Sequence, residues 1–137
     1  KAVQLYKIII YDDHDAGSNK GEIYLYFRWS LGPDETNHWF DPSQWIFRDY
    51  HWEEGEHTLG DCYIYPDLLA EDDFLWIKFG LSESDDRPFN WRSQGLGSCE
   101  ILHSPDPTQE NSWKTGGEFE CPSDTWDFKA LYRIILE

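Results

Sequence analysis

The sequence contains no methionine and only three cysteines, Cys62, Cys99 and Cys121. Their spacing matches no Cys-x-x-Cys pattern, so a zinc site is not expected. Three cysteines cannot all pair within one chain. Cys99 and Cys121 both lie in the loop-rich C-terminal third, where a disulfide between them would imply an oxidising compartment. Three reduced cysteines in a cytosolic protein are the alternative.

Basic residues are also scarce. Eleven Lys and Arg residues stand against 27 Asp and Glu residues, which gives a formal net charge of −16. Such a charge argues against binding to nucleic acid or to an anionic membrane by bulk electrostatics. It also opposes compaction through self-repulsion, so bound divalent cations would stabilise the fold by mass action. Solubility or a salt-rich source is the simpler explanation of the same charge.

Catalytic and targeting motifs are missing as well. The sequence has no P-loop, no G-x-G-x-x-G fingerprint, no H-E-x-x-H and no G-x-S-x-G elbow. It has no secretory signal, no apolar run of membrane-spanning length and no N-x-S/T acceptor. The chain begins with Lys1 rather than methionine, from which we expect a processed or excised product. We expect it to be secreted or extracellular, with a cytoplasmic location as the alternative.

Strand signals dominate what is present, and the 137 residues form one expected domain, residues 1–137. The segments with strand-like composition or alternation are residues 3–11, 22–29, 39–50, 58–65, 74–81, 96–102 and 130–136. Only residues 66–72 resemble a helix. Residues 104–127 are rich in Pro, Gly, Ser and Asp, although residues 117–121 could pair locally. This pattern predicts an all-β fold, a single antiparallel β-sandwich of seven or eight strands with long C-terminal loops.

The most informative stretch follows the first strand. There an apolar run ends at Asp12, Asp13 and Asp15, and Glu22 opens the next alternating strand. A second acidic group, Glu83, Asp85 and Asp86, follows the strand at residues 74–81. Dense like charges repel one another unless a cation lies among them, and oxygen ligands without neighbouring Cys favour Ca²⁺. A solvated acidic turn is the alternative for either group.

Both groups follow the C-terminal end of a strand. If the two strands lie side by side and parallel, or face each other across a sandwich, six to eight oxygens could converge on one or two calcium ions. The first loop is not an EF-hand, because strands flank it and Tyr24 occupies the position of the bidentate glutamate. Glu22 either completes the site or merely begins a strand. Asp72 and Asp73 precede a strand, so we place them at the opposite end.

This arrangement resembles the calcium-dependent lipid-binding domains of protein kinase C and synaptotagmin. Those domains are eight-stranded sandwiches in which carboxylates from two distant loops hold calcium at one end. The resemblance covers residues 11–22 and 80–86. It implies that Asp12, Asp13 and Asp15 are ligands from the first loop and that Glu83, Asp85 and Asp86 are ligands from the later one. The sequence lacks the basic lipid-facing patch of that family, which argues against membrane binding.

Two further features have alternative interpretations. His51 and His57 flank an acidic hairpin and could bind a transition metal together, although an exposed hairpin is the simpler reading. Several of the eight tryptophans lie in polar or loop segments. Such rings either pack long loops or form platforms for sugar rings and protein partners.

The leading hypothesis is a non-catalytic calcium-binding module whose acidic loops stabilise the fold or present a Ca²⁺-dependent surface for a carbohydrate, protein or lipid head group. The second is an acidic interaction or inhibitor protein that engages a basic partner by long-range steering. The third is a small carbohydrate-active hydrolase with one perturbed carboxylate in a cleft.

Overall fold

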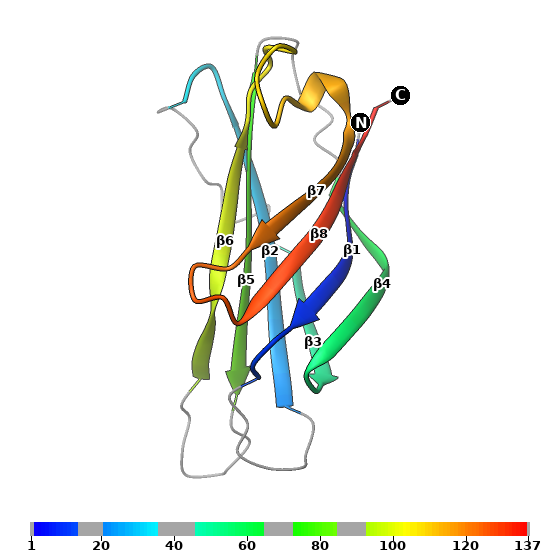
Figure 1. The fold of residues 1–137 in the computed structure, drawn as a ribbon, viewed down its shortest axis with the longest axis vertical. Helices are drawn as coiled ribbons and strands as arrows, with labels where there is room; N and C mark the ends of the chain where they lie inside the picture. Colours follow the sequence, from blue (N-terminus) through cyan, green and yellow to red (C-terminus); the bar gives the residue numbers. More distant parts are fainter. Residues whose placement is uncertain (1, 14–20, 36–45, 65–72, 85–92, 137) are drawn as a thin grey trace.

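The computed structural model describes residues 2–13, 21–35, 46–64, 73–84 and 93–136. These residues form eight antiparallel strands in two four-stranded sheets (Figure 1). The strands are β1 (Ala2–Ile10), β2 (Gly21–Gly32), β3 (Ile46–Trp52), β4 (Gly55–Ile64), β5 (Phe74–Ser84), β6 (Ser93–His103), β7 (Gly117–Pro122) and β8 (Phe128–Ile135). The expected all-β sandwich is confirmed. The helix expected at residues 66–72 lies outside the described residues.

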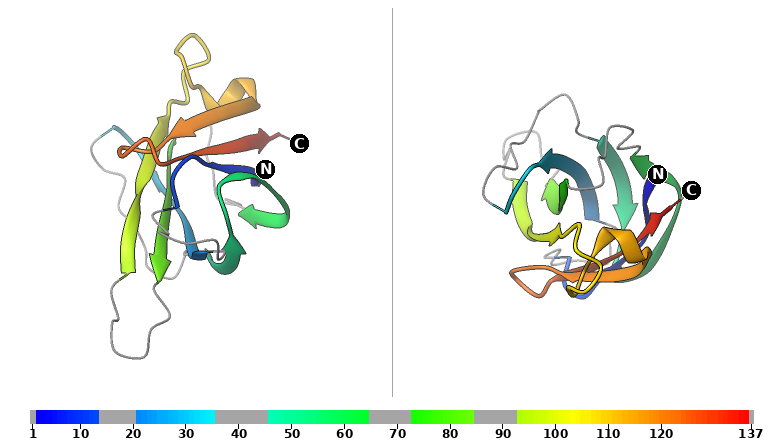
Figure 2. Two further views of the ribbon diagram at one scale, coloured as in Figure 1. Left: turned by 60° about the horizontal axis from the view of Figure 1, so that its bottom comes forward. Right: turned by 90° about the horizontal axis from the view of Figure 1, so that it is seen from above.

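The strand order is β4-β1-β8-β7 in one sheet and β3-β2-β5-β6 in the other. The two sheets pack face to face, as the views in Figure 2 show. Phe27 of β2 lies against Phe79 of β5 within one sheet, with ring centroids 4.5 Å apart. Phe79 also contacts Tyr132 of β8 in the opposite sheet at 5.2 Å. These aromatic contacts join the two layers at the centre of the core.

Alternation explains the inner faces of β2 and β5. The side chains that β5 buries are Leu75, Ile77, Phe79 and Leu81, and those that β2 buries are Ile23, Leu25 and Phe27. Successive residues of a strand point to opposite faces, so a two-residue period buries one face only. The sequence predicts this face correctly in both strands.

Strand β1 is a central strand, paired with β4 on one side and β8 on the other. A register shift between Leu5 and Lys7 interrupts both pairings. A bulge of this kind reverses the alternation, so the buried positions change from Val3 and Leu5 to Ile8 and Ile10. This reversal explains why the sequence of β1 shows apolar residues at both odd and even positions.

The C-terminal third is more regular than the sequence suggests. The irregular segment ends at a short 3-10 helix (Trp113–Thr115), and β7 then pairs with β8 as an edge strand. The local pairing expected at residues 117–121 is therefore confirmed, while the long loop ends earlier than expected. A disulfide joins Cys99 of β6 to Cys121 of β7 and links the two sheets. Cys62 is a buried thiol.

A polar pair is buried within this core. His103 is fully buried, and its Nδ1 lies 2.6 Å from the carbonyl oxygen of Asn111. Its Nε2 lies 2.7 Å from the hydroxyl oxygen of Tyr132. A carbonyl can only accept, so Nδ1 carries the proton and the Tyr132 hydroxyl donates to Nε2. Burial lowers the pKa of His103 to about 4, because the charged imidazolium would lose its hydration.

Candidate metal centre

The segment that follows β1 is attached to the β7–β8 hairpin. The carbonyl oxygen of Asp127 accepts the backbone N–H groups of Tyr11 at 2.7 Å and Asp12 at 3.2 Å. These two bonds fix the backbone where the first acidic group begins. Asp12 is exposed, whereas Asp13 is only 7% exposed. The described acidic segment therefore starts from a fixed backbone and buries one of its two aspartates.

The β3–β4 hairpin carries a third carboxylate, that of Glu54. The hairpin turn lies between Trp52, the last residue of β3, and Gly55, which has a φ of +126°. That φ favours glycine. His57 Nε2 lies 2.6 Å from the carbonyl oxygen of Glu53, to which it can donate across the turn.

Three stacked rings brace the same hairpin. The Tyr50 and Trp52 ring centroids are 4.0 Å apart, and those of Trp52 and His57 are 4.5 Å apart. The interplanar angles are 9° and 11°. This stack joins Tyr50 and Trp52 of β3 to His57 of β4, and the contact of His57 with the Glu53 carbonyl joins β4 to the turn. The position of Glu54 therefore depends on packing beyond its own side chain.

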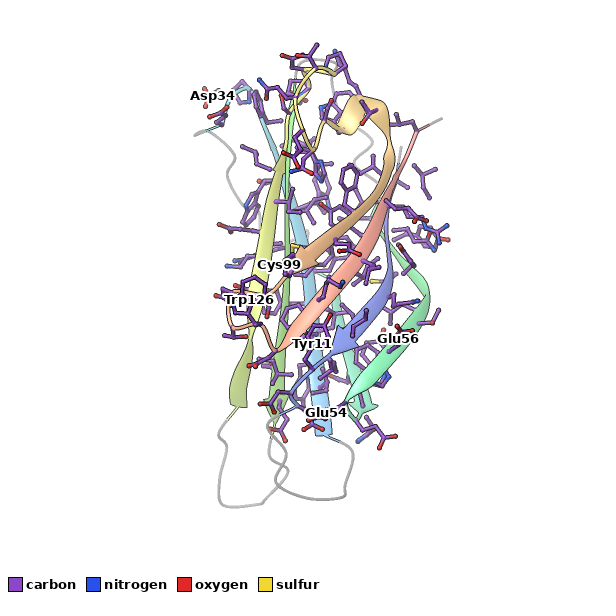
Figure 3. All side chains as sticks on the ribbon, viewed as in Figure 1. Tyr11, Asp34, Glu54, Glu56, Cys99 and Trp126 are labelled. Atoms are coloured by element: carbon purple, nitrogen blue, oxygen red, sulfur yellow. A yellow bond between two sulfur atoms is a disulfide. The ribbon has the colours of Figure 1, made fainter. Side chains whose placement is uncertain are left out.

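Asp12, Asp13 and Glu54 come together at one end of the sandwich. Each offers a carboxylate oxygen, and the three oxygens lie within 4.8 Å of one another. The pairing of β1 with β4 explains the cluster, because Ile10 lies opposite Gly55 in the register. The end of one strand thereby lies beside the turn that precedes the other. Figure 3 shows Glu54 and Tyr11 at this end of the molecule.

The three oxygens lie close enough together for one cation to contact all of them. Calcium binds oxygen at 2.3–2.6 Å, so two ligand oxygens on opposite sides of one ion are about 5 Å apart. Two unit charges 4–5 Å apart repel by about 1 kcal/mol in water and by several-fold more near a low-dielectric surface. A divalent cation among the three carboxylates would replace this repulsion with attraction. Only oxygen ligands are offered here, which favours Ca²⁺ over a transition metal.

Sequence reasoning identified Asp12 and Asp13 but missed Glu54. It interpreted the segment between His51 and His57 only as an acidic hairpin, and the structure confirms the hairpin. The missing information was the register between β1 and β4, which depends on long-range pairing. The acidic composition of the turn was the only local signal.

Glu83, the described member of the second acidic group, lies at the same end of the sandwich. Strands β1 and β5 belong to different sheets, so the expectation that they could be adjacent in one sheet is wrong. Both strands run toward the same end in Figure 1. Glu83 is 9% exposed and lies opposite Ile23 near the start of β2. A shared rim is consistent with the alternative expectation that the strands lie across a sandwich.

The remaining expected ligands are less fully described. Glu22 is paired with Ser84 in the β2–β5 register, but its side chain lies outside the described part. Asp15, Asp85 and Asp86 lie outside the described residues, as does Asp72. The Asp73 carbonyl accepts the indole N–H of Trp113 at 2.8 Å, at the start of β5 and thus at the opposite end, as expected.

Among the described residues, neither His51 nor His57 belongs to a group of three or more possible metal ligands. Across the ranges that the structure describes, the only group of three or more possible metal ligands is Asp12, Asp13 and Glu54. His57 already contacts the Glu53 carbonyl through Nε2. Nothing in this geometry favours a transition-metal site at His51 and His57.

Comparisons with known proteins add no family assignment. No protein-family model matches the sequence, and no curated protein is significantly similar to it. Within the described ranges, no helix has the length and apolar character needed to cross a membrane. Functional inference therefore depends on the site itself.

Proposed function

We propose that this protein is a non-catalytic calcium-binding β-sandwich module. The observation that carries the proposal is the convergence of Asp12, Asp13 and Glu54 from two separate elements to within 4.8 Å. Glu83, near the end of β5, lies at the same end of the sandwich. Calcium held there would join the β1–β2 connection to the β3–β4 hairpin. The proposed result is a stabilised rim that can present a surface to a carbohydrate, a protein or a lipid head group.

Charge supports this proposal. The net charge of −16 penalises the folded state through self-repulsion, and a divalent ion at the acidic end offsets part of that penalty. The eight strands, with Asp12, Asp13, Glu54 and Glu83 at one end, support the proposal, because the calcium-dependent lipid-binding domains that the sequence resembles hold calcium at one end of an eight-stranded sandwich. We propose a calcium site of that general type, with a ligand contributed by the β3–β4 hairpin.

Thermal unfolding with and without calcium tests the proposal. A ligand that binds only the folded state stabilises it by about 2.7 kcal/mol at a free concentration one hundred times its Kd. We therefore expect a higher melting temperature in millimolar calcium than in chelator. Magnesium should have a smaller effect, because it demands a stricter octahedral geometry.

A matched pair of variants locates the ion. Glu54→Gln removes one proposed ligand charge, whereas Glu53→Gln removes the same charge from the adjacent exposed position. We expect the first variant to reduce the calcium-induced shift and the second to retain it. Equal melting temperatures in chelator and in calcium for the wild type would overturn the proposal.

A further inference from the structure

The turn between β7 and β8 presents an unusual residue. The Trp126 side chain is 74% exposed, and its backbone has a φ of +64°. That left-handed conformation normally favours Gly, Asn or Asp, because a Cβ crowds the following carbonyl. Trp126 is therefore unfavourable in two respects: its large apolar ring is exposed to solvent, and its backbone has a conformation that tryptophan rarely adopts. Departures of this kind are typical of functional sites.

The turn itself is tightly organised around Ser123. The Trp126 N–H donates to the Ser123 carbonyl at 3.1 Å, and the Ser123 N–H donates to the Phe128 carbonyl at 3.0 Å. The Ser123 hydroxyl oxygen accepts the N–H groups of Asp127 at 3.1 Å and Phe128 at 3.3 Å. These bonds hold the left-handed residue in place, so the Trp126 ring is carried on an ordered turn.

The same turn is anchored to β6 of the other sheet. The Asp124 N–H donates to the Ser98 carbonyl at 2.8 Å, and the Ser98 N–H donates to Asp124 Oδ1 at 2.9 Å. The Thr125 hydroxyl donates to the Leu96 carbonyl. A Cβ added at Gly97 would lie 2.6 Å from Asp124 Oδ1, so glycine permits the close approach. The nearby Cys99–Cys121 disulfide adds a covalent link between β6 and β7.

A cleft of about 340 Å³ lies between this hairpin and the β5–β6 pair. It is lined by Lys78, Ser98, Cys99, Glu100, Pro122 and Asp124. Figure 3 shows Trp126 on the β6 side of the molecule, at the turn that contributes Asp124 to the lining. The same turn therefore carries both the exposed ring and one of the residues that line the cleft.

The cleft offers both donors and acceptors. Lys78 and Glu100 lie opposite each other in the β5–β6 register. Both residues belong to the part of the chain that the structure describes, and no ion pair joins them. Asp124 also lines the cleft, and its Oδ1 accepts the Ser98 N–H. One ammonium and two carboxylates do not select a simple anion or cation. They suit a neutral ligand rich in hydroxyl groups, which can donate to carboxylates and accept from lysine.

We propose that Trp126 and this cleft form a binding site for a neutral carbohydrate. The apolar C–H face of a pyranose ring would stack on the Trp126 indole, while ring hydroxyls would bond to Asp124, Glu100 and Lys78. A pre-ordered aromatic platform reduces the entropy lost on binding. The site lies outside the acidic triad, and none of its proposed contacts requires a metal ion. The inference therefore goes beyond the proposed calcium function and does not depend on it.

Affinity electrophoresis in soluble neutral polysaccharides (mixed-linkage β-glucan, xylan and galactomannan) tests the site in the presence of chelator. We expect at least one polysaccharide to retard the wild type. Isothermal titration with oligosaccharides from that polymer should show that Trp126→Gly weakens binding by about tenfold or more, the loss of one stacking contact. Glu100→Gln should weaken binding to a smaller extent.

Two controls separate binding from folding. Glycine relieves the backbone at position 126, so the melting temperature of Trp126→Gly should equal or exceed that of the wild type. Tyr24→Ala removes another exposed aromatic side chain and should leave binding unchanged. The proposal would be overturned if none of the three polysaccharides retarded the wild type. It would also be overturned if Trp126→Gly bound carbohydrate as tightly as the wild type. If the wild type bound no carbohydrate but self-associated, and Trp126→Gly abolished that self-association, the ring would instead belong to a protein interface.

Discussion

The backbone N–H of Tyr11 donates to the carbonyl oxygen of Asp127 at 2.7 Å. This bond joins the first acidic segment to the hairpin that carries Trp126. The Asp127 carbonyl therefore connects the two proposed sites: it follows Trp126 in the chain and accepts hydrogen bonds from the segment that carries Asp12 and Asp13. Ordering of one segment can reduce the entropy cost of ordering the other, even though neither site contributes ligands to its partner.

The β3–β4 hairpin should control calcium binding through His57. His57→Ala removes both the ring stacked on Trp52 and the contact with the Glu53 carbonyl. We expect a stability loss of about 1 kcal/mol, the usual contribution of one such hydrogen bond. We also expect calcium to bind several-fold more weakly, because Glu54 would be less well positioned. Isothermal titration with calcium measures this effect.

His51→Ala is the matched control, since His51 is exposed on the same hairpin. It should retain the calcium affinity of the wild type. If His57→Ala bound calcium with unchanged affinity, the hairpin would not position a ligand.

Stability should depend on pH through His103. Its pKa in the folded protein is about 4, below the ordinary value of about 6.5 in the unfolded chain. Between these values the unfolded state binds more protons, so the free energy of unfolding falls as the pH decreases from 6.5 toward 4. The contribution of this one group is about 3 kcal/mol over that interval. Urea denaturation in chelator measures it.

His103→Phe should flatten this part of the pH profile, because the variant has no imidazole to protonate. His51→Ala should keep the wild-type slope. Identical slopes in wild type and His103→Phe would show that other groups account for the acid sensitivity.

Gly80 should resist substitution because of Tyr26. These two residues are directly opposite in the β2–β5 register, and a Cβ at Gly80 would lie 1.8 Å from Tyr26 Cζ. Gly80→Ala should therefore lower the free energy of unfolding by about 1–3 kcal/mol, the usual cost of overpacking. Chemical denaturation of the two single variants and of Tyr26→Ala/Gly80→Ala measures the coupling. Gly80→Ala should lower the free energy of unfolding less when Tyr26 is already alanine, because the ring is then absent. If the two substitutions lowered the free energy of unfolding additively, the close contact would not explain the cost.

The Cys99–Cys121 disulfide should contribute substantially to stability. The two cysteines are 22 residues apart in sequence, and closing a loop of that length stabilises a protein by about 3 kcal/mol in the chain-entropy model. Reductant should lower the urea midpoint of the wild type accordingly. The double variant Cys99→Ala/Cys121→Ala should already have a low midpoint and should not respond further to reductant. A wild-type midpoint unaffected by complete reduction would refute the prediction.

Local sequence patterns predict much of the fold. The alternation from Leu75 to Leu81 identifies both the strand and its buried face, because a strand has a two-residue period. Strand β7 is harder to predict. Its exposed Glu118 and Glu120 leave it with few apolar residues, as is typical of an edge strand protected against further pairing.

The candidate sites are less accessible from sequence, because they depend on contacts between distant segments. Asp12 and Asp13 are adjacent in the chain, but Glu54 joins them only through the β1–β4 register. Trp126 is one of eight tryptophans, and only its exposure and left-handed backbone distinguish it. The hydrogen bonds between the β7–β8 turn and β6 span 26 or more residues. No local pattern encodes such pairings.

Cys62 gives the molecule an internal reporter. Its side chain is 2% exposed, and it lies opposite Leu5, where the edge strand β4 joins the first sheet. A thiol-reactive reagent can reach the sulfur only when the core around Cys62 opens, by separation of β4 or by unfolding. The rate of alkylation therefore reports how often this part of the core opens, in an otherwise unmodified protein whose other two cysteines are joined in a disulfide.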